Sequence, residues 1–328
     1  MGSGQVALCA ETNMDSLMKA IVTGGAGFIG SHLVDRLINE GWEVLVVDNL
    51  ASGHLDNLKS SREFGKVKVH TLDILDRDLA AVFGRFRADR VFHLAAQASV
   101  STSMSDPMFD ARVNVLGTIS VLEASRKSGV GRVVFASSGG ALAGPGSAIP
   151  TKETQKPRPI SPYGVAKLAA SEYLAMYERT YGLEYVVIAP ANVYGPRQRA
   201  HAEGGVVAIF VETLMAGRAA TIFGDGSQTR DFVYVADVAD AFYKAASTKN
   251  VGRTYNVGTG TETTITDLYA LISQATGGPA KPIFEAAKPG DIERSALDAS
   301  AAVRGLDWAP WTAVVEGIAE TVRHYRRG

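Results

Sequence analysis

A tyrosine and a lysine four residues apart, Tyr163 and Lys167, are the side chains best suited to chemistry in this sequence. They follow Ser161-Pro162, and proline is favoured early in a helix because it lacks an N–H that the first turn would leave unpaired in any case. Residues four apart share a helix face, so the phenol and the ammonium can point into one site. A free tyrosine has a pKa of about 10, and a nearby cation is expected to lower it. The pair is therefore a candidate proton acceptor and donor.

Ser138 stands 25 residues before Tyr163, just after an expected strand over 132–137. Open α/β sheets bind ligands at the carboxyl ends of their strands. Ser138 could donate a hydrogen bond to the same substrate oxygen that Tyr163 serves. A YxxxK pair alone also fits an ordinary surface contact, but the serine at a strand end favours an active site.

A glycine-rich loop runs from Thr23 to Gly30, with Gly24, Gly27 and Gly30 in GxxGxxG spacing. Glycine permits a tight turn, a close approach of the backbone to a pyrophosphate, and close packing of helix on sheet. The helix that follows offers free N–H groups to phosphates. Asp48, 18 residues after Gly30, could accept hydrogen bonds from a ribose hydroxyl and would repel a 2′-phosphate. This favours NAD over NADP, although Asp48 could also simply open a loop.

The elements that must position these groups alternate between strands and helices. Strands are predicted over 19–23, 43–48, 67–71, 90–94, 132–137 and 185–189, with helices over 28–40, around 113–128 and over 161–181. Near-continuous apolar strands indicate a parallel sheet covered on both faces. We therefore predict an α/β fold, a Rossmann-type doubly wound parallel sheet with a smaller, interleaved C-terminal substrate lobe. The NAD-binding domain is placed at 18–190 and the substrate lobe at 191–328, with segments near 231–260, notably 231–235 and 255–257, returning to the first domain.

Composition excludes several classes of protein. The 328 residues are 46% hydrophobic, enough for a large core, and 33 basic side chains nearly balance 34 acidic ones, so no nucleic-acid partner is expected. No apolar run approaches the ~20 residues of a membrane span. The first 17 residues lack Lys and Arg and do not resemble a signal peptide, and Cys9 is the one cysteine. We expect these residues to lie outside the fold and the protein to be cytoplasmic, without a membrane partner.

Several longer stretches carry a family resemblance. From about Met18 to Tyr325 the sequence resembles the extended short-chain dehydrogenase/reductases, and within them the bacterial UDP-glucose (UDP-galactose) 4-epimerases. The stretches that carry it are TGGAGFIGSHL, VVDNLASG, FHLAAQASV, VNVLGT, FASSGGA, SPYGVAK, ANVYGPRQ, FGDGSQTRDFVYVADV and KPGD. These motifs are specific for sugar-nucleotide enzymes and less specific for one reaction.

The resemblance implies an NAD-dependent isomerase acting on a UDP-sugar. Its catalytic set falls on Ser138, Tyr163 and Lys167. Tyr163 would remove the proton of the sugar 4-hydroxyl while C4 gives a hydride to NAD, and the hydride would return to the other face of a transient 4-keto sugar. Lys167 would also hold the nicotinamide ribose, and no metal is implied.

The resemblance further assigns residues to binding. Cofactor-binding positions are Gly24, Gly27, Phe28, Ile29, Gly30, Asp48, Asn49, Asp73, Ile74, Leu94, Ala95, Ala96, Tyr163 and Lys167. Substrate-binding positions are Ser138, Tyr163, Asn192, Arg230, Lys288 and Asp291. Asn192 and Arg230 would lie at the nucleotide diphosphate, and Asp291 at the uridine ribose. His93 is expected to be structural rather than catalytic.

Three positions depart from the family pattern. Ala143 stands where a tyrosine is common, and Lys288 where arginine is usual. Ser295 occupies the place where a bulky residue restricts the C2 substituent, which raises the hypothesis that N-acetylated sugars fit.

Other reactions of the family remain alternatives. Dehydratases carry an Asp-Glu pair directly after the serine, and decarboxylases a nearby glutamate, whereas this chain has Gly139-Gly140. UDP-glucuronate 4-epimerase would need polar groups for a C6 carboxylate, for which Arg197, Arg199 and the serines at 99–103 are candidates. Three further alternatives are a UDP-GlcNAc 4-epimerase, a different NAD-dependent enzyme that modifies sugar nucleotides, and a scaffold that binds the cofactor and carries out no chemistry.

The family resemblance also implies a homodimer through helices around 108–128 and 161–181.

Overall fold

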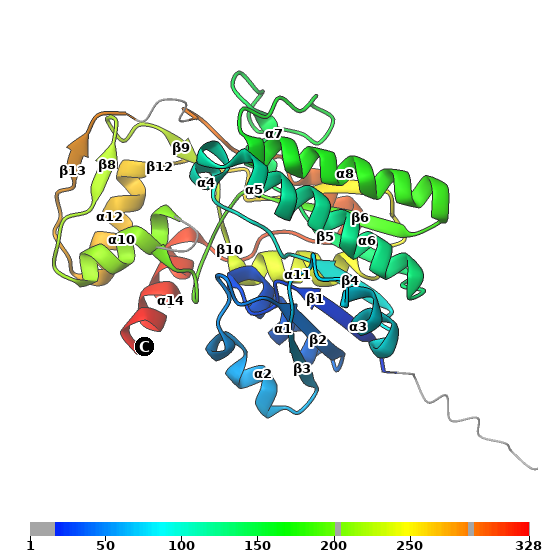
Figure 1. The fold of residues 1–328 in the computed structure, drawn as a ribbon. Coiled ribbons are helices and arrows are strands. Elements are labelled where there is room, and N and C mark those ends of the chain that lie inside the picture. The colour runs from blue at the N-terminus through cyan, green and yellow to red at the C-terminus, as the bar shows by residue number, and fades with distance from the viewer. Residues whose placement is uncertain (1–16, 201–204, 288–291, 328) are drawn as a thin grey trace, which may run out of the picture.

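A seven-stranded parallel sheet forms the centre of the molecule (Figure 1). The structure, a computed structural model, describes residues 17–200, 205–287 and 292–327. The strand order is β11-β6-β5-β4-β1-β2-β3. These strands are β1 (Lys19–Thr23), β2 (Glu43–Asp48), β3 (Val67–Thr71), β4 (Arg90–His93), β5 (Arg132–Ala136), β6 (Glu184–Pro190) and β11 (Arg253–Val257). The order reverses between β1 and β4, which is where open α/β sheets bind ligands.

Helices cover both faces of this sheet because its strands are apolar on both sides. In β1, Ala20 and Val22 belong to one core cluster and Ile21 to another. The first cluster is closed by α1 (Phe28–Asn39), α11 (Val235–Ala245) and α13 (Ser300–Leu306), and the second by α3 (Leu79–Phe86), α6 (Gly117–Lys127) and α8 (Pro162–Tyr181). The predicted Rossmann-type doubly wound fold is therefore confirmed.

Helix ends follow local chemistry. Ser161 caps α8 by accepting a hydrogen bond from the Gly164 N–H at 3.2 Å, and Gly182 ends the helix with φ +70°. Such a left-handed residue favours glycine. The helix α1 ends at Asn39, and Gly41 follows with φ +82°. Both termini are close to those predicted from the sequence.

In the described part of the chain, a second lobe contains helices and short paired strands (Figure 1). Its helices are α10 (Val206–Met215), α12 (Ile265–Thr276) and α14 (Val314–Arg327). The paired strands are β7 (Asn192–Tyr194) with β10 (Phe232–Tyr234), β9 (Thr229–Arg230) with β12 (Thr263–Thr264), and β8 (Thr221–Phe223) with β13 (Ile283–Glu285). Segment 255–257 joins the large sheet as part of β11. Segment 231–235 does not join it, because its strand β10 pairs with β7, which starts just after β6 ends and lies outside the large sheet. The domain limits themselves stay a prediction.

Shorter elements lie at the carboxyl edge of the sheet and in its connections. They are η1 (Leu55–Leu58), α2 (Lys59–Glu63), α4 (Val100–Ser105), α5 (Pro107–Ala111), the π-helix η2 (Arg112–Leu116) and α7 (Gly139–Ala143). Among the described residues, no helix combines the length and apolar character needed to cross a bilayer.

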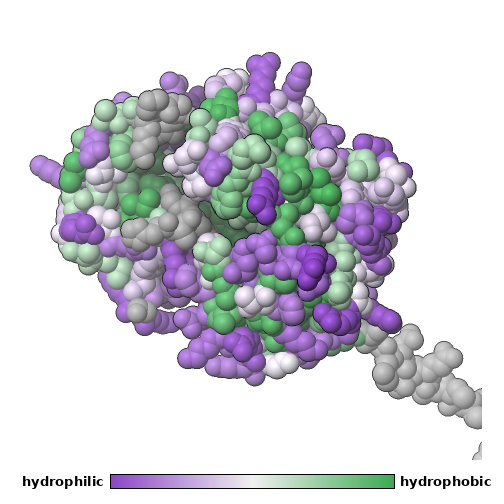
Figure 2. Space-filling model, viewed as in Figure 1, coloured by the Kyte–Doolittle hydropathy of each residue, from purple (hydrophilic) through white to green (hydrophobic). Residues whose placement is uncertain are grey.

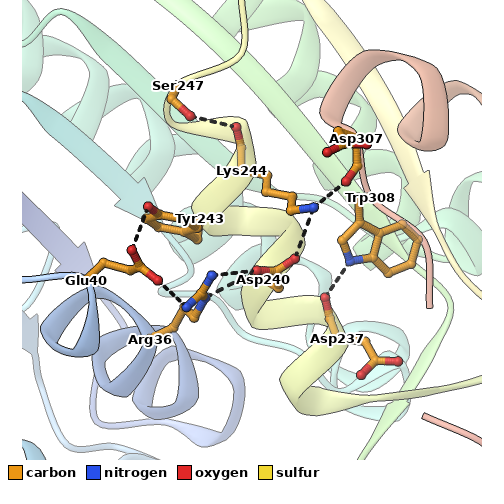
Figure 3. Close-up of polar contacts among 9 residues, drawn as sticks. All are labelled: Arg36, Glu40, Asp237, Asp240, Tyr243, Lys244, Ser247, Asp307 and Trp308. Carbon is orange, nitrogen blue, oxygen red and sulfur yellow. Dashed lines mark hydrogen bonds and ion pairs between the residues drawn. The ribbon is translucent and has the colours of Figure 1, made fainter. Parts of the chain in front are cut away.

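The helix α11 is attached to the rest of the molecule through polar contacts (Figure 3). Arg36 of α1 reaches the Asp240 carboxylate at 3.0 Å, and the Lys244 ammonium of α11 donates a hydrogen bond to the Asp307 carbonyl oxygen. The Trp308 indole donates a hydrogen bond to the Asp237 carbonyl oxygen at 2.7 Å. The chain after the second lobe thereby returns to the first, which makes the two lobes interleaved.

Candidate active site

The structure brings Ser138, Tyr163 and Lys167 together beyond the end of β5. Ser138 lies at the start of α7, and its hydroxyl accepts a hydrogen bond from the Ala141 N–H at 3.4 Å. The Ser138 hydroxyl also lies close enough to Tyr163 to influence its pKa. The Lys167 ammonium donates to the Ala136 carbonyl oxygen at 2.9 Å and lies 5.8 Å from the centre of the Tyr163 ring. The predicted catalytic residues can therefore act on one substrate oxygen.

Burial shifts the pKa values of this pair. Desolvation lowers the pKa of Lys167, 3% exposed, to about 8, an effect that Asp110 opposes. Desolvation raises the pKa of Tyr163 to about 12, while the hydrogen bond from Ser138 lowers it and Asp110 raises it. The prediction that a neighbouring cation lowers the Tyr163 pKa below its usual value is thus wrong for the chain by itself. The reason is that loss of hydration outweighs the other influences.

The glycine loop has the shape that a dinucleotide needs. Gly24 has φ +71°, and a Cβ there would lie 2.6 Å from the Ala95 nitrogen. A Cβ on Gly30 would lie 2.1 Å from the Gly24 carbonyl oxygen. Only glycine fits at these two positions. The loop therefore lies close to the backbone of Leu94 and Ala95, and the helix α1 lies close to the loop. The first-turn N–H groups of α1, at Phe28 and Ile29, have no intrahelical partner by helix geometry, and such groups suit a phosphate.

Asp48 ends β2 beside this loop and is 7% exposed. Its carboxylate accepts hydrogen bonds from the N–H groups of Ala26 and Leu50, at 2.9 and 2.8 Å. Each carboxylate oxygen has a second lone pair for a ribose hydroxyl. Asn49 donates to the Asp73 carboxylate at 2.8 Å, which joins the ends of β2 and β3. These contacts fit the adenosine half of NAD.

The remaining predicted cofactor residues line the same edge. Ile74 is 6% exposed, and its side chain packs against Gly117, where an added Cβ would lie 2.5 Å from the Ile74 Cδ1 atom. The N–H of Leu94 donates to Thr23 at 3.0 Å, so the 94–96 segment follows directly beside the glycine loop. The described cofactor residues therefore lie together at the switch point of the sheet.

The predicted substrate residues lie partly in the second lobe. Asn192 begins β7, and Arg230 ends β9; the N–H of Asn192 donates to Asp231, the neighbour of Arg230, at 2.9 Å. Lys288 and Asp291 lie outside the described residues. Figure 2 shows the surface hollowed between the lobe of α10 and α12 and the body of the molecule.

A buried polar network beside the candidate catalytic residues was not predicted. Asp110 is fully buried and accepts hydrogen bonds from Gln97 at 2.8 Å and from Asn114 at 2.9 Å. Asn114 lies in the π-helix η2, a distortion frequent at functional sites. The sequence signal for this network was an aspartate and an asparagine among apolar positions of the expected helix. Polar side chains at such buried positions need hydrogen-bond partners, so they form a network.

A second unpredicted residue, Asp231, is fully buried between the lobes. Its carboxylate accepts hydrogen bonds from the N–H groups of Thr259, Gly260 and Leu297, at 2.9, 3.0 and 3.2 Å. It thereby fixes the residue next to Arg230. The sequence signal was its place beside an arginine expected to bind the diphosphate.

His93 is buried between two threonines, in agreement with a structural role. Its ring nitrogens lie 2.8 Å from the Thr23 hydroxyl and 3.1 Å from the Thr118 hydroxyl. Desolvation, and secondarily the Lys167 charge, lowers the His93 pKa to about 3.

We expect stability to decrease as the pH falls from about 6.5 toward 3. Over this range the unfolded chain binds a proton at His93 that the folded protein does not, so the free energy of unfolding decreases by up to ~1.4 kcal/mol per pH unit. Urea unfolding of His93→Gln at several pH values and saturating NAD should give a shallower acid dependence than the parent. Equal slopes would contradict this assignment.

Comparison with known proteins agrees with this geometry. The model of the NAD dependent epimerase/dehydratase family matches residues 20–258. The chain belongs to that family. It is 49% identical over 309 residues to UDP-glucose 4-epimerase of Mycolicibacterium smegmatis, covering 94% of this chain and 99% of the relative. NAD is the cofactor of this family, and the glycine cradle above fits it.

Two solved structures of family members resemble this one closely. UDP-glucose 4-epimerase of Thermotoga maritima with UDP-glucose has a TM-score of 0.91 and 44% identity, covering 94% of this chain and 99% of that one. The Thermus thermophilus UDP-glucose 4-epimerase in complex with NAD has a TM-score of 0.86 and 42% identity, with the same coverage. The family assignment made from the sequence motifs is confirmed.

Proposed function

We propose that this protein interconverts UDP-glucose and UDP-galactose by inverting C4 of the sugar. The observation that carries the proposal is the joint placement of Ser138, Tyr163 and Lys167 beside a glycine cradle that fits NAD. The resemblance to UDP-glucose 4-epimerases over nearly the whole chain supports the substrate.

The three side chains have complementary roles in this reaction. Tyr163 takes the proton of the 4-hydroxyl and later returns it to the 4-keto oxygen, while Ser138 donates a hydrogen bond to the same oxygen. Lys167 provides positive charge and, with the glycine loop, holds the cofactor. Bound NAD supplies the hydride acceptor for C4 and the donor on return. The Tyr163 pKa of about 12 applies to the chain without ligands. Proton transfer therefore depends on charge that the bound cofactor and substrate add to the site, which changes this pKa.

The second lobe supplies the grip on the nucleotide. Arg230, on β9, is suited to the diphosphate because its planar guanidinium can make paired hydrogen bonds to phosphate oxygens. Asn192 begins the adjoining β7. Lys288 and Asp291 remain proposed contacts from the sequence.

The position after Ser138 argues against a dehydratase. A Cβ on Gly139 would lie 2.3 Å from the Cδ1 atom of Leu297 and 3.1 Å from the Ala189 carbonyl oxygen. A carboxylate at this position would therefore displace Leu297. The epimerase reaction needs no such additional acid.

The contacts of Arg197 and the nearby serines argue against a glucuronate substrate. Arg197 forms an ion pair with Asp35 of α1 at 2.7 Å, so its charge is directed toward the first lobe. Ser99 caps α4, and Ser103 is buried and donates to the Val100 carbonyl oxygen. Ser99 and Ser103 are thus occupied by contacts within the chain, and Arg197 is held by its ion pair, although its buried Nη1 atom has no hydrogen-bond partner among the described residues.

The test is incubation of the purified protein with UDP-galactose without added reductant, with UDP-glucose measured by chromatography. Conversion in both directions to one equilibrium ratio is expected. Absence of conversion in a protein that contains NAD would reject this substrate, and UDP-glucuronate and UDP-GlcNAc would be assayed next.

UDP-GlcNAc is a second candidate substrate because of the small side chain at Ser295. A Cβ on Gly140 would lie 3.7 Å from the Ser295 hydroxyl, which places Ser295 next to α7 and the catalytic serine. Ala143, in contrast, lines a pocket with Leu142, Glu153 and Glu172 that Tyr163 does not line. Space for an N-acetyl group therefore depends on Ser295.

We expect Ser295→Tyr to reduce kcat/KM for UDP-GlcNAc at least tenfold relative to that for UDP-galactose. A tyrosine would fill the space that the acetamido group needs, and overpacking of this kind costs about 1–3 kcal/mol. Steady-state kinetics with both substrates measure the ratio. No detectable UDP-GlcNAc turnover by the parent protein would reject this second substrate.

We also propose that the protein is a homodimer. Exposed apolar side chains gather on α4, α5, η2 and α8, where Figure 2 shows hydrophobic surface; they are Val100, Met104, Met108, Phe109, Leu116 and Val165. Met108 is 80% exposed. An apolar patch of this extent is typical of a protein interface.

The variant Met108→Glu/Leu116→Glu should halve the mass measured by light scattering, because two charges would be buried unpaired in the interface. Val315→Glu, an equally apolar and exposed position on α14, is the control and should keep the parent mass. A monomeric parent protein would overturn the dimer.

A further inference from the structure

One short segment, residues 292–297, connects the proposed diphosphate site with the proposed catalytic site. At its start, Arg230 donates a hydrogen bond to the Ile292 carbonyl oxygen at 2.5 Å. At its end, Leu297 packs against Gly139, next to the catalytic Ser138. Ser295 lies between these anchors. The position of the segment therefore affects both ends of a bound nucleotide sugar.

A single carboxylate joins this segment to the strand of Arg230. Glu262 precedes β12, and its carboxylate receives two hydrogen bonds from the Arg294 guanidinium, one from Nε at 2.9 Å and one from Nη2. The Thr229 hydroxyl, on β9, donates to the same carboxylate. The Thr229 N–H also donates to the Glu293 carbonyl oxygen at 2.9 Å. Glu262 therefore bridges β9 and the 292–297 segment.

The charge and exposure of this bridge indicate a geometric role. Hydrogen bonds from Arg294, and then from Thr229, lower the Glu262 pKa to about 2, so the carboxylate is ionised throughout any assay range. The Arg294 side chain is 62% exposed and that of Glu262 23% exposed. Such exposed pairs contribute little to the free energy of unfolding, whereas paired guanidinium–carboxylate hydrogen bonds fix orientation.

We propose that Glu262 is a positioning residue, which sets the 292–297 segment against β9 through Arg294 and Thr229 and thereby sets the affinity for the nucleotide sugar. The inference rests on the proposed function for the identity of that ligand. The Leu297 end of the segment is held separately, because the Leu297 N–H donates to the buried Asp231 carboxylate at 3.2 Å, so Glu262 sets mainly the end near Arg230. Its effect should therefore fall on binding rather than on the chemical step.

Kinetics of Glu262→Gln test the proposal. We expect KM for UDP-galactose to increase by roughly three- to tenfold, with kcat changed less than about twofold and NAD content and Tm unchanged. Glu123→Gln is a matched control: Glu123 also receives two hydrogen bonds from one arginine, Arg126, both at 3.0 Å, and one from a hydroxyl, Tyr177, at 2.9 Å. It lies on α6 and should leave KM unchanged.

Exchange of the charges provides the second test. Glu262→Arg combined with Arg294→Glu should recover much of the affinity that either single variant loses. Equal KM values for Glu262→Gln and the parent, or a loss of Tm and kcat with KM unchanged, would overturn the proposal.

Calorimetric binding of UDP separates this proposal from the proposed function. If the parent binds UDP but does not convert UDP-galactose, the proposed function fails, and the ratio of UDP Kd values between parent and Glu262→Gln still decides the role of Glu262. A ratio near one overturns that role. If the parent does not bind UDP, both proposals fail.

Discussion

Replacement of Tyr163 by phenylalanine should lower kcat for UDP-galactose by roughly 10²- to 10⁴-fold, the usual contribution of a positioned acid–base group. The variant loses only the hydroxyl, whose pKa Ser138 influences. The ring remains beside the Lys167 ammonium, 5.8 Å from its centre, so packing is largely preserved. Coupled detection of UDP-glucose measures the effect, together with the NAD content of the purified variant.

The control for this experiment lies on the same helix. Tyr173→Phe removes a hydroxyl from a half-exposed tyrosine of α8 that has no place in the proposed site, and it should retain parental kcat. A Tyr163→Phe variant that keeps more than about a tenth of the parental kcat, with NAD bound, would remove Tyr163 from the proposed acid–base role.

Gly30→Ala should remove bound NAD from the purified protein and raise the Kd for NAD by at least about a hundredfold. The new Cβ would lie 2.1 Å from the Gly24 carbonyl oxygen and 2.9 Å from the Gly25 Cα atom. These neighbours are backbone atoms of the same loop, so the helix α1 must move away from the loop to admit the methyl group. Such movement destroys the close approach that a pyrophosphate requires.

A graded pair keeps this second result interpretable. A Cβ on Gly27 would have its nearest neighbour at 3.2 Å, so Gly27→Ala should weaken NAD binding less than Gly30→Ala. Gly84→Ala on α3 is the control, since its Cβ would have only Ser128 within reach, at 3.8 Å, and helix propensity should rise. If Gly30→Ala retained parental NAD affinity, the proposed cradle would be wrong.

Much of the first lobe could be predicted from the sequence because its elements are encoded locally. The strand 67–71 and the helix beginning at Phe28 have the predicted limits, since apolar spacing and the flanking glycines act over a few residues. The second lobe was harder to predict. Its strands, such as Thr229–Arg230 and Thr263–Thr264, have two residues each and no periodicity that could be read.

The sequence by itself determined the family, through its resemblance along motifs from about Met18 to Tyr325. It also indicated the cofactor and the candidate catalytic residues, because the glycine loop and the Tyr163–Lys167 pair act through short spacings. The tertiary structure decided which distant residues meet. It directs Arg197 toward Asp35, joins Glu262 to Arg294, and leaves Asp110 buried beside the catalytic pair. It also raises the Tyr163 pKa rather than lowering it. These properties depend on burial and on contacts between remote segments, and neither is encoded in local residue spacing.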